Sequence, residues 1–183
     1  MSIHRAQVHW QLGEAEDFLA GRYRRAHRLG FDGGAEVAGS ASPQVVGKWA
    51  DAAAVDPEEM LVAAISACHM LTFLHRARLA GFTVLAYRDH AEGVMAEIAP
   101  ERHAITRVML RPGITWRGAA PDAARLAALH HEAHEHCFIA NSIRTEVTIG
   151  PPLEDQPRED KPPEDQPSGG AAAMGISRGS AGG

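Results

Sequence analysis

The sequence has little cysteine, few aromatic residues and no excess of positive charge. It contains 2 Cys among 183 residues, which excludes a small secreted scaffold held together by disulfides. Aromatic residues make up 5% of the chain, and its 18 Lys and Arg are outnumbered by 23 Asp and Glu, giving a net charge of -5. A basic, aromatic-rich surface for nucleic acid is therefore not expected.

The sequence also shows no apolar leader and no long uninterrupted apolar run. It begins "MSIHRAQVHWQLGE", which has no apolar signal-peptide core. The longest apolar stretch, residues 60–74, is interrupted by Ser66, His69 and Thr72 and falls short of the roughly 20 residues of a membrane span. We therefore expect a soluble cytoplasmic protein with no membrane partner.

The composition changes at residue 151. The segment "PPLEDQPREDKPPEDQPSGGAAAMGISRGSAGG" is rich in Pro, Gly and acidic residues, and it repeats "EDQP" at an interval of ten residues. It has no aromatic residue and almost no aliphatic ones, so burial cannot offset its ordering entropy. The sequence predicts one folded domain over residues 1–150 and a disordered tail over 151–183, with a docking segment as the alternative for the tail.

Hydrophobic periodicity predicts an α+β domain. Alternating apolar residues indicate strands, and spacings of three and four indicate helices. Strands are predicted at 4–12, 22–31, 82–97, 104–116 and 144–150, with one short strand inside the loop 36–55 and turns at 14–21 and 99–103. Helices are predicted at 57–80 and 121–143. Two helices packed on antiparallel sheet account for this order.

The helix predicted at 57–80 has clear end signals and an apolar middle. Asp56 suits the N-cap, Pro57 the first helical position, Glu59 completes a capping box, and Gly81 suits the position just past the end. Its middle, "MLVAAISACHMLTFL", is apolar on nearly every side, which predicts a helix enclosed by other structure. This helix carries Cys68.

The second cysteine, Cys137, lies in the second predicted helix, 69 residues after Cys68. Both helices must pack on the same small sheet, so the two thiols can meet. A free cysteine is often simply a small core residue. The pair is therefore either a redox couple or two core cysteines.

Two segments resemble one known family. "DPEEMLVAAISACHM" and "HEHCFIANSIRTEVTI" are similar to the two cysteine segments of the OsmC/Ohr family, the osmotically inducible and organic hydroperoxide resistance proteins, and the resemblance covers about residues 5–149. It implies the OsmC-like fold, in which antiparallel sheets wrap around two central helices. It also implies an intertwined homodimer with active sites at the interface, and a thiol peroxidase activity without cofactor or bound metal.

The resemblance also assigns roles. Cys68 matches the peroxidatic cysteine, Cys137 the resolving cysteine and Glu58 the family's carboxylate. The family places an arginine near the reactive thiol, for which Arg25 is our first choice. The other candidate cations are Arg22, Arg24, Arg28 and Lys48.

These roles fit the chemistry of thiols. A cysteine attacks peroxide as its thiolate, and burial alone raises its pKa above about 8.5, so a fixed guanidinium must lie close by and needs a carboxylate partner. Glu58 and Cys68 are separated by about 15 Å along one helix. We therefore expect Glu58 to come from the partner subunit. The expected cycle reduces an organic hydroperoxide through a Cys68 sulfenic acid and a Cys68–Cys137 disulfide. An external dithiol then restores the thiols, and the resemblance suggests a lipoylated protein.

The histidines suggest alternatives. His130, His131, His134 and His136 precede Cys137 and permit three interpretations: a solvated helix face, tuning of Cys137, or a metal site. His69 is expected to be a hydrogen-bonded core histidine. The alternatives to a peroxidase are therefore an OsmC-like dimer that binds a small apolar ligand and has inactive cysteines, and a dimer that binds metal through the histidines.

Overall fold

The computed structural model describes residues 1–153 of the chain. Its strands are β1 (Ala6–His9), β2 (His27–Phe31), β3 (Glu36–Gly39), β4 (Thr83–Asp89), β5 (Glu92–Ala99), β6 (Arg102–Leu110), β7 (Pro112–Arg117) and β8 (Glu146–Ile149). Its helices are α1 (Pro43–Val46), α2 (Pro57–Leu79) and α3 (Ala123–His136), with single 3₁₀ turns η1 (Gly47–Trp49) and η2 (Ala140–Ser142). Apart from its first three residues, the predicted tail lies outside the described residues.

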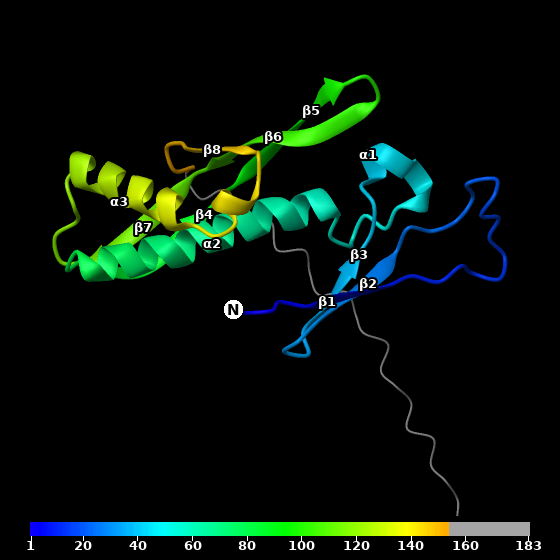
Figure 1. The fold of residues 1–183 in the computed structure, drawn as a ribbon, viewed down its shortest axis with the longest axis horizontal. Helices are drawn as coiled ribbons and strands as arrows, with labels where there is room; N and C mark the ends of the chain where they lie inside the picture. Colours follow the sequence, from blue (N-terminus) through cyan, green and yellow to red (C-terminus); the bar gives the residue numbers. More distant parts are fainter. Residues whose placement is uncertain (154–183) are drawn as a thin grey trace, which may run out of the picture. The chain divides into compact units, whose positions relative to one another are not determined.

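The strands form three small sheets, which confirms the α+β class (Figure 1). Their orders are β1-β2-β3, β4-β7 and β5-β6-β8. Every pairing is antiparallel except β6 with β8, which is parallel. The expectation of purely antiparallel sheet is therefore wrong at β8. The chain reaches β8 after crossing through α3, and a helical crossover returns a strand in the parallel direction.

Each of the two long strands predicted in the middle of the chain is in fact two strands. The segment 82–97 breaks after Asp89, and the segment 104–116 breaks at Arg111. The Asp89 carboxylate accepts a hydrogen bond from the backbone N–H of Arg111 at 2.6 Å, which ties the two breaks together. As a result, β4 and β7 form one sheet while β5 and β6 form the hairpin of another.

Helix α2 begins as predicted and ends one residue earlier. The Asp56 carboxylate accepts from the N–H of Glu59 at 2.7 Å, and the N–H of Asp56 donates to the Glu59 carboxylate at 3.0 Å. This reciprocal capping box satisfies two N–H groups that the helix itself cannot pair. Past the last turn, Gly81 has a φ of 85°, a left-handed conformation that favours glycine.

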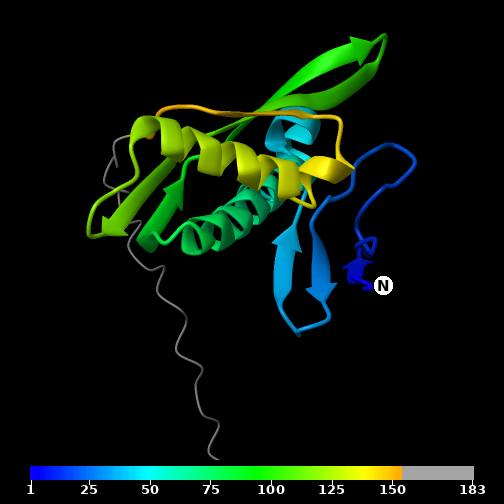
Figure 2. The same cartoon turned by 60° about the vertical axis from the view of Figure 1, so that its left-hand side comes forward.

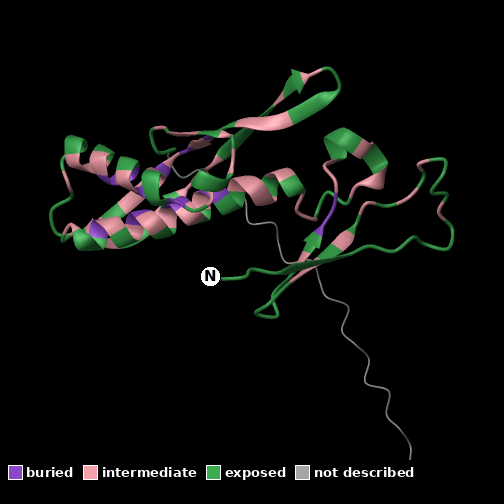
Figure 3. Cartoon of the chain, in the orientation of Figure 1, coloured by how far each residue is buried: buried purple, intermediate pink, exposed green. Residues whose placement is uncertain are grey.

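The core lies along one stripe of α2 (Figure 3). Its buried residues, spaced by four, are Ile65, His69, Phe73 and Ala77. Phe73 and Ala77 pack with Leu129 and Ala133 of α3 and with strands β4 and β7. Ile65 packs on the β6 side.

The rest of α2 is less covered than expected. The exposed face carries Ala63, Ala64, Ala67 and Leu71. In length and composition α2 would suit a membrane span, although core helices of soluble proteins have the same properties. Only 22% of its most apolar 18-residue stretch is buried. The expectation that no segment is apolar enough is thus wrong. Other structure was expected to enclose this helix, and within residues 1–153 it does so along one stripe only. One chain covers a single stripe.

The β1-β2-β3 sheet lies beside the amino-terminal end of α2 (Figures 1 and 2). All four residues of β1 are exposed. The sheet is tied to the segment before α2 by backbone hydrogen bonds from Ser40 to Val55 at 3.1 Å and from Arg25 to Trp49 at 2.9 Å. The short helix α1, which the sequence analysis did not predict, lies in this connection.

Candidate functional site

The two cysteines lie together where α2 and α3 pack side by side. Cys68 is half-buried in the middle of α2, and Cys137 is buried immediately after the last residue of α3. Both are free thiols. Burial raises the pKa of the Cys137 thiol, and a hydrogen-bonding contact with the Cys68 thiol raises it further. The reduced chain therefore holds Cys137 as a protonated thiol next to Cys68.

Cys137 is placed by the early end of α3. The helix stops at His136 instead of continuing to 143, and Cys137 has extended backbone angles. The N–H of Ala140 then donates to the Cys137 sulfur at 3.4 Å, and the N–H of Asn141 donates to the Cys137 carbonyl at 3.0 Å. The second cysteine thus sits on a helix end followed by a tight turn, with its sulfur directed back to α2.

Within residues 1–153, the five candidate cations contact groups other than Cys68. Four of them have surface partners: Arg22 with Asp17 at 2.6 Å, Arg24 with Glu16 at 3.9 Å, Arg28 with Glu36 at 3.4 Å, and Lys48 over the Trp49 ring at 5.2 Å. The fifth, Arg25, is half-buried.

Arg25 and Glu58 are brought to one pocket. The Arg25 guanidinium donates to the carbonyls of Tyr23 and Gly21, the latter at 3.3 Å, and lies 3.6 Å from the Tyr23 ring centroid. The pocket has a volume of about 410 Å³, and Glu58, in the first turn of α2, also lines it. Of the candidate cations, Arg25 alone shares this pocket with Glu58.

One chain therefore contains two separate groups of predicted site residues. The cysteine pair lies at the middle of α2, and the Arg25–Glu58 pocket lies at its amino-terminal end. Ten residues of helix place them about 15 Å apart. Cys68 does not line the pocket, so the described chain alone does not assemble a cation, a carboxylate and a thiol.

The pocket has aromatic walls that sequence reasoning did not find. Trp10, Phe18 and Tyr23 line it, and their rings contact one another at centroid distances of 4.8 to 6.0 Å. The segment containing Phe18 has no periodic pattern, so the sequence predicts only a turn there. Three aromatic residues within 14 positions were the available signal.

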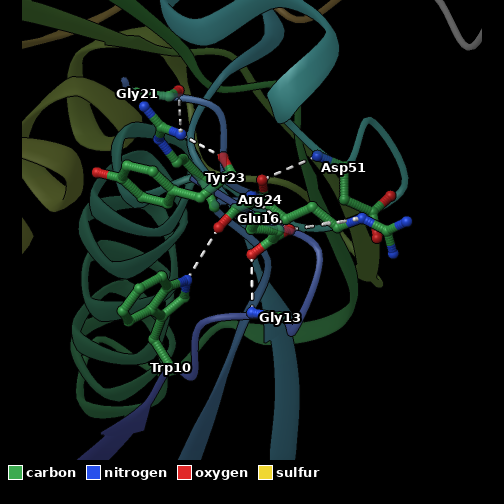
Figure 4. Close-up of polar contacts among 9 residues, drawn as sticks. Trp10, Gly13, Glu16, Gly21, Tyr23, Arg24 and Asp51 are labelled. Carbon is green, nitrogen blue, oxygen red and sulfur yellow. Dashed lines mark hydrogen bonds and ion pairs between the residues drawn. The ribbon is translucent and has the colours of Figure 1, made fainter. Parts of the chain in front are cut away.

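The loop that carries these rings is braced by polar contacts (Figure 4). The Glu16 carboxylate accepts from the N–H groups of Gly13 at 2.9 Å and Arg24 at 3.0 Å, and these bonds lower its pKa. The Trp10 indole N–H donates to the Arg24 carbonyl at 2.9 Å. The backbone of Arg24, which precedes Arg25, is therefore held at both its N–H and its carbonyl.

The histidines are partly internal. His69 and His130 are buried, with His69 Nε2 and His130 Nδ1 3.1 Å apart and their rings nearly parallel. This confirms His69 as a hydrogen-bonded core histidine. The solvated-face interpretation is wrong for His130, because its position on α3 faces α2, and it fits the exposed His131 and His136. Among residues 1–153, no group of three or more His, Cys, Asp or Glu side chains is arranged to hold a metal ion.

This buried pair predicts a loss of stability in acid. Burial lowers the pKa of both His69 and His130 from 6.5 to about 4. Between these values the unfolded state binds more protons than the folded state. The contribution of the pair to the free energy of unfolding is therefore fully present above pH 6.5 and falls as the pH drops towards 4. The loss is on the order of 3 kcal/mol per histidine. Urea unfolding at steps from pH 7 to 4.5 measures it.

A His130→Leu variant is expected to have a clearly shallower decline over the same range. Replacement of the exposed His131 by Gln is the matched control on the same helix and is expected to leave the slope unchanged. If His130→Leu declines as steeply as the wild type, the buried pair is not the cause of the acid lability.

The chain is similar to known proteins in sequence and in fold. Residues 50–151 match the family model described as OsmC-like protein. An OsmC-like protein of unknown function from Vibrio cholerae is 43% identical, with a TM-score of 0.78 over 82% of this chain and 99% of that one. No curated protein matches the chain.

More distant structures share the fold. An organic hydroperoxide resistance protein OsmC from Legionella pneumophila is 20% identical, with a TM-score of 0.62 over 84% of this chain and 98% of that one. An organic hydroperoxide resistance protein from Bacillus subtilis is 16% identical, with a TM-score of 0.58 over 84% of this chain and 98% of that one. Both span nearly the whole described domain.

Proposed function

Because this chain belongs to the family of OsmC-like proteins, we propose that it is a two-cysteine thiol peroxidase that reduces organic hydroperoxides. The observation that carries the proposal is the contact between the thiols of Cys68 and Cys137. They come from different helices and are held together in the reduced chain, so a disulfide between them needs no large rearrangement. Organic hydroperoxide resistance proteins of the same fold add support.

The proposed cycle begins at Cys68. Its thiolate attacks the terminal peroxide oxygen, the O–O bond breaks, and the leaving alkoxide takes a proton to become an alcohol. Cys68 is then a sulfenic acid. The Cys137 thiol attacks it, water leaves, and the disulfide forms. An external dithiol, for which a lipoylated protein is our proposal, reduces this disulfide and is itself oxidised.

We also propose that two copies of the chain complete each site. The exposed apolar face of α2 and the exposed β1 are surfaces that a second copy would cover. Such a homodimer would bring the partner's Arg25 and Glu58 to Cys68. The guanidinium would stabilise the thiolate and the carboxylate would pair with the guanidinium. We place this reaction in the cytoplasm, where the chain's thiols stay reduced.

A second candidate function follows from the aromatic walls of the pocket. Trp10, Phe18 and Tyr23 would suit a small apolar ligand even if the cysteines were inert. In that case the protein would be a ligand-binding dimer. The test below separates the two functions.

Thiol titration tests the peroxidase. The reduced full-length chain is mixed with one equivalent of an alkyl hydroperoxide, and free thiols are counted over seconds. We expect two thiols to disappear per chain and a peptide map to contain a Cys68–Cys137 link. Unchanged thiols would refute the peroxidase and favour the ligand-binding dimer.

A further inference from the structure

The pocket beside Arg25 offers its apolar surface close to the guanidinium. The Arg25 Cζ lies 3.6 Å from the centroid of the Tyr23 ring, and the Tyr23 ring stacks on Phe18 at 4.8 Å. Trp10 meets Tyr23 edge to face at 5.5 Å. A ligand whose polar head binds this guanidinium therefore has its next one or two carbon atoms beside aromatic rings.

The polar groups lining the pocket are largely engaged with the protein. The His27 Nδ1 is 2.8 Å from the Arg25 carbonyl, and the Ser42 hydroxyl accepts from the N–H of Gln44 at 3.3 Å. The other lining residues that are not aromatic or charged are Val8, Ala41, Val45 and Pro57. Beyond the Arg25 and Glu58 head-group end, the pocket thus favours an apolar group.

The rings are held in place before any ligand arrives. Trp10 is anchored through its indole N–H to the Arg24 carbonyl, and Glu16 closes the same loop across Gly13 and Arg24 (Figure 4). The Asp17–Arg22 ion pair at 2.6 Å closes the turn that carries Phe18. Preorganised rings bind a flat ring with little loss of side-chain freedom, and aromatic pairs prefer offset or edge-to-face contacts.

We propose that this pocket selects hydroperoxides that carry an aromatic ring one or two carbons from the O–O group, and that Trp10 is the residue that sets this preference. The inference rests on the proposed peroxidase function and names its substrate class. A straight alkyl chain lacks a ring face at this position and loses the ring contacts. The reaction remains the two-electron reduction of the hydroperoxide to an alcohol by the two cysteine thiols.

Steady-state kinetics with two substrates test the preference. For the wild type we expect kcat/KM to be at least about tenfold higher for cumene hydroperoxide than for tert-butyl hydroperoxide, which has the same tertiary centre without the ring. Trp10→Leu should remove most of this difference through KM. Trp10→Phe, which keeps a ring but loses the indole N–H, should retain it. Leu19→Ala, at an exposed position on the same loop, is the matched control and should leave kcat/KM unchanged for both substrates.

A binding experiment separates the inference from the proposed function. The unreactive alcohol 2-phenylpropan-2-ol, the expected product, is titrated into the reduced full-length protein and followed by ligand-observed NMR. Binding that disappears in Trp10→Leu supports the pocket even if no hydroperoxide is turned over, in which case only the peroxidase fails. Turnover of both hydroperoxides at equal kcat/KM overturns the aryl preference and leaves the peroxidase standing. An equal loss on both substrates in Trp10→Leu also overturns it.

Discussion

Replacement of Cys68 by Ser is expected to abolish peroxidase turnover, with a loss of roughly a thousandfold or more. The serine hydroxyl is not ionised near neutral pH and does not accept an oxygen atom from a peroxide. The change is nearly isosteric at a half-buried position, so the fold should survive. Hydroperoxide consumption with a small dithiol as reductant measures the effect. Residual activity above about a tenth of wild type contradicts the assignment of Cys68.

Cys137→Ser is the companion variant and should behave differently. Cys68 is intact, so one equivalent of hydroperoxide should be consumed rapidly, and the sulfenic acid should then persist because its partner thiol is missing. A dione reagent that labels sulfenic acids should modify Cys68 in this variant and much less in the wild type. Equal labelling of both proteins would show that Cys137 does not resolve the intermediate.

Mixing two inactive variants is expected to restore activity. Arg25→Leu should remove most turnover because Cys68 loses its cation, whereas Arg28→Leu, at an exposed ion pair, should retain it. If Arg25 serves the partner's Cys68, a heterodimer of Arg25→Leu with Cys68→Ser contains one intact site. Random exchange makes half of the dimers mixed, so about a quarter of wild-type activity should return, provided the sites act independently.

The control for this mixture combines two variants that both change the cysteine pair. Cys68→Ser and Cys137→Ser change two thiols that meet within one chain, so their heterodimer contains no intact cysteine pair and should stay inactive. Subunits are exchanged by mild denaturation and refolding in both mixtures. No recovery in the Arg25→Leu mixture would show that cation and thiol come from the same chain, and the composite site would then be wrong.

Local signals in the sequence predicted the parts of the fold that local forces determine. Helix α2 begins at Pro57 as predicted because Asp56 and Glu59 form a capping box within four residues of chain. The break between β4 and β5 was missed, because extended backbone continues on both sides and Asp89 is tied to Arg111 from a distant strand. The parallel pairing of β8 was missed for the same reason, since pairing is a long-range property.

The candidate site shows the same division. The two cysteines could be singled out from the sequence, but their contact depends on how α2 and α3 pack. A polar side chain on a helix usually faces water, which favours the solvated-face interpretation of the histidine cluster, yet His130 pairs with His69 between the two helices. Arg25 and Glu58 came from the family resemblance. The aromatic pocket appears only when the loop is folded, because Trp10, Phe18 and Tyr23 follow no regular spacing.

The braced loop of the aromatic pocket has a consequence for how such a protein can diversify. Trp10 and Phe18 are partly exposed, and the loop is held by Glu16 and backbone hydrogen bonds and not by burial in the main core of α2 and α3. Substitutions of these rings should therefore change ligand preference at little cost in folding free energy. The residues that we expect to set ligand preference are thus different from those that stabilise the fold. Single substitutions in the loop could therefore change the preferred ligand during evolution while the folding free energy is preserved.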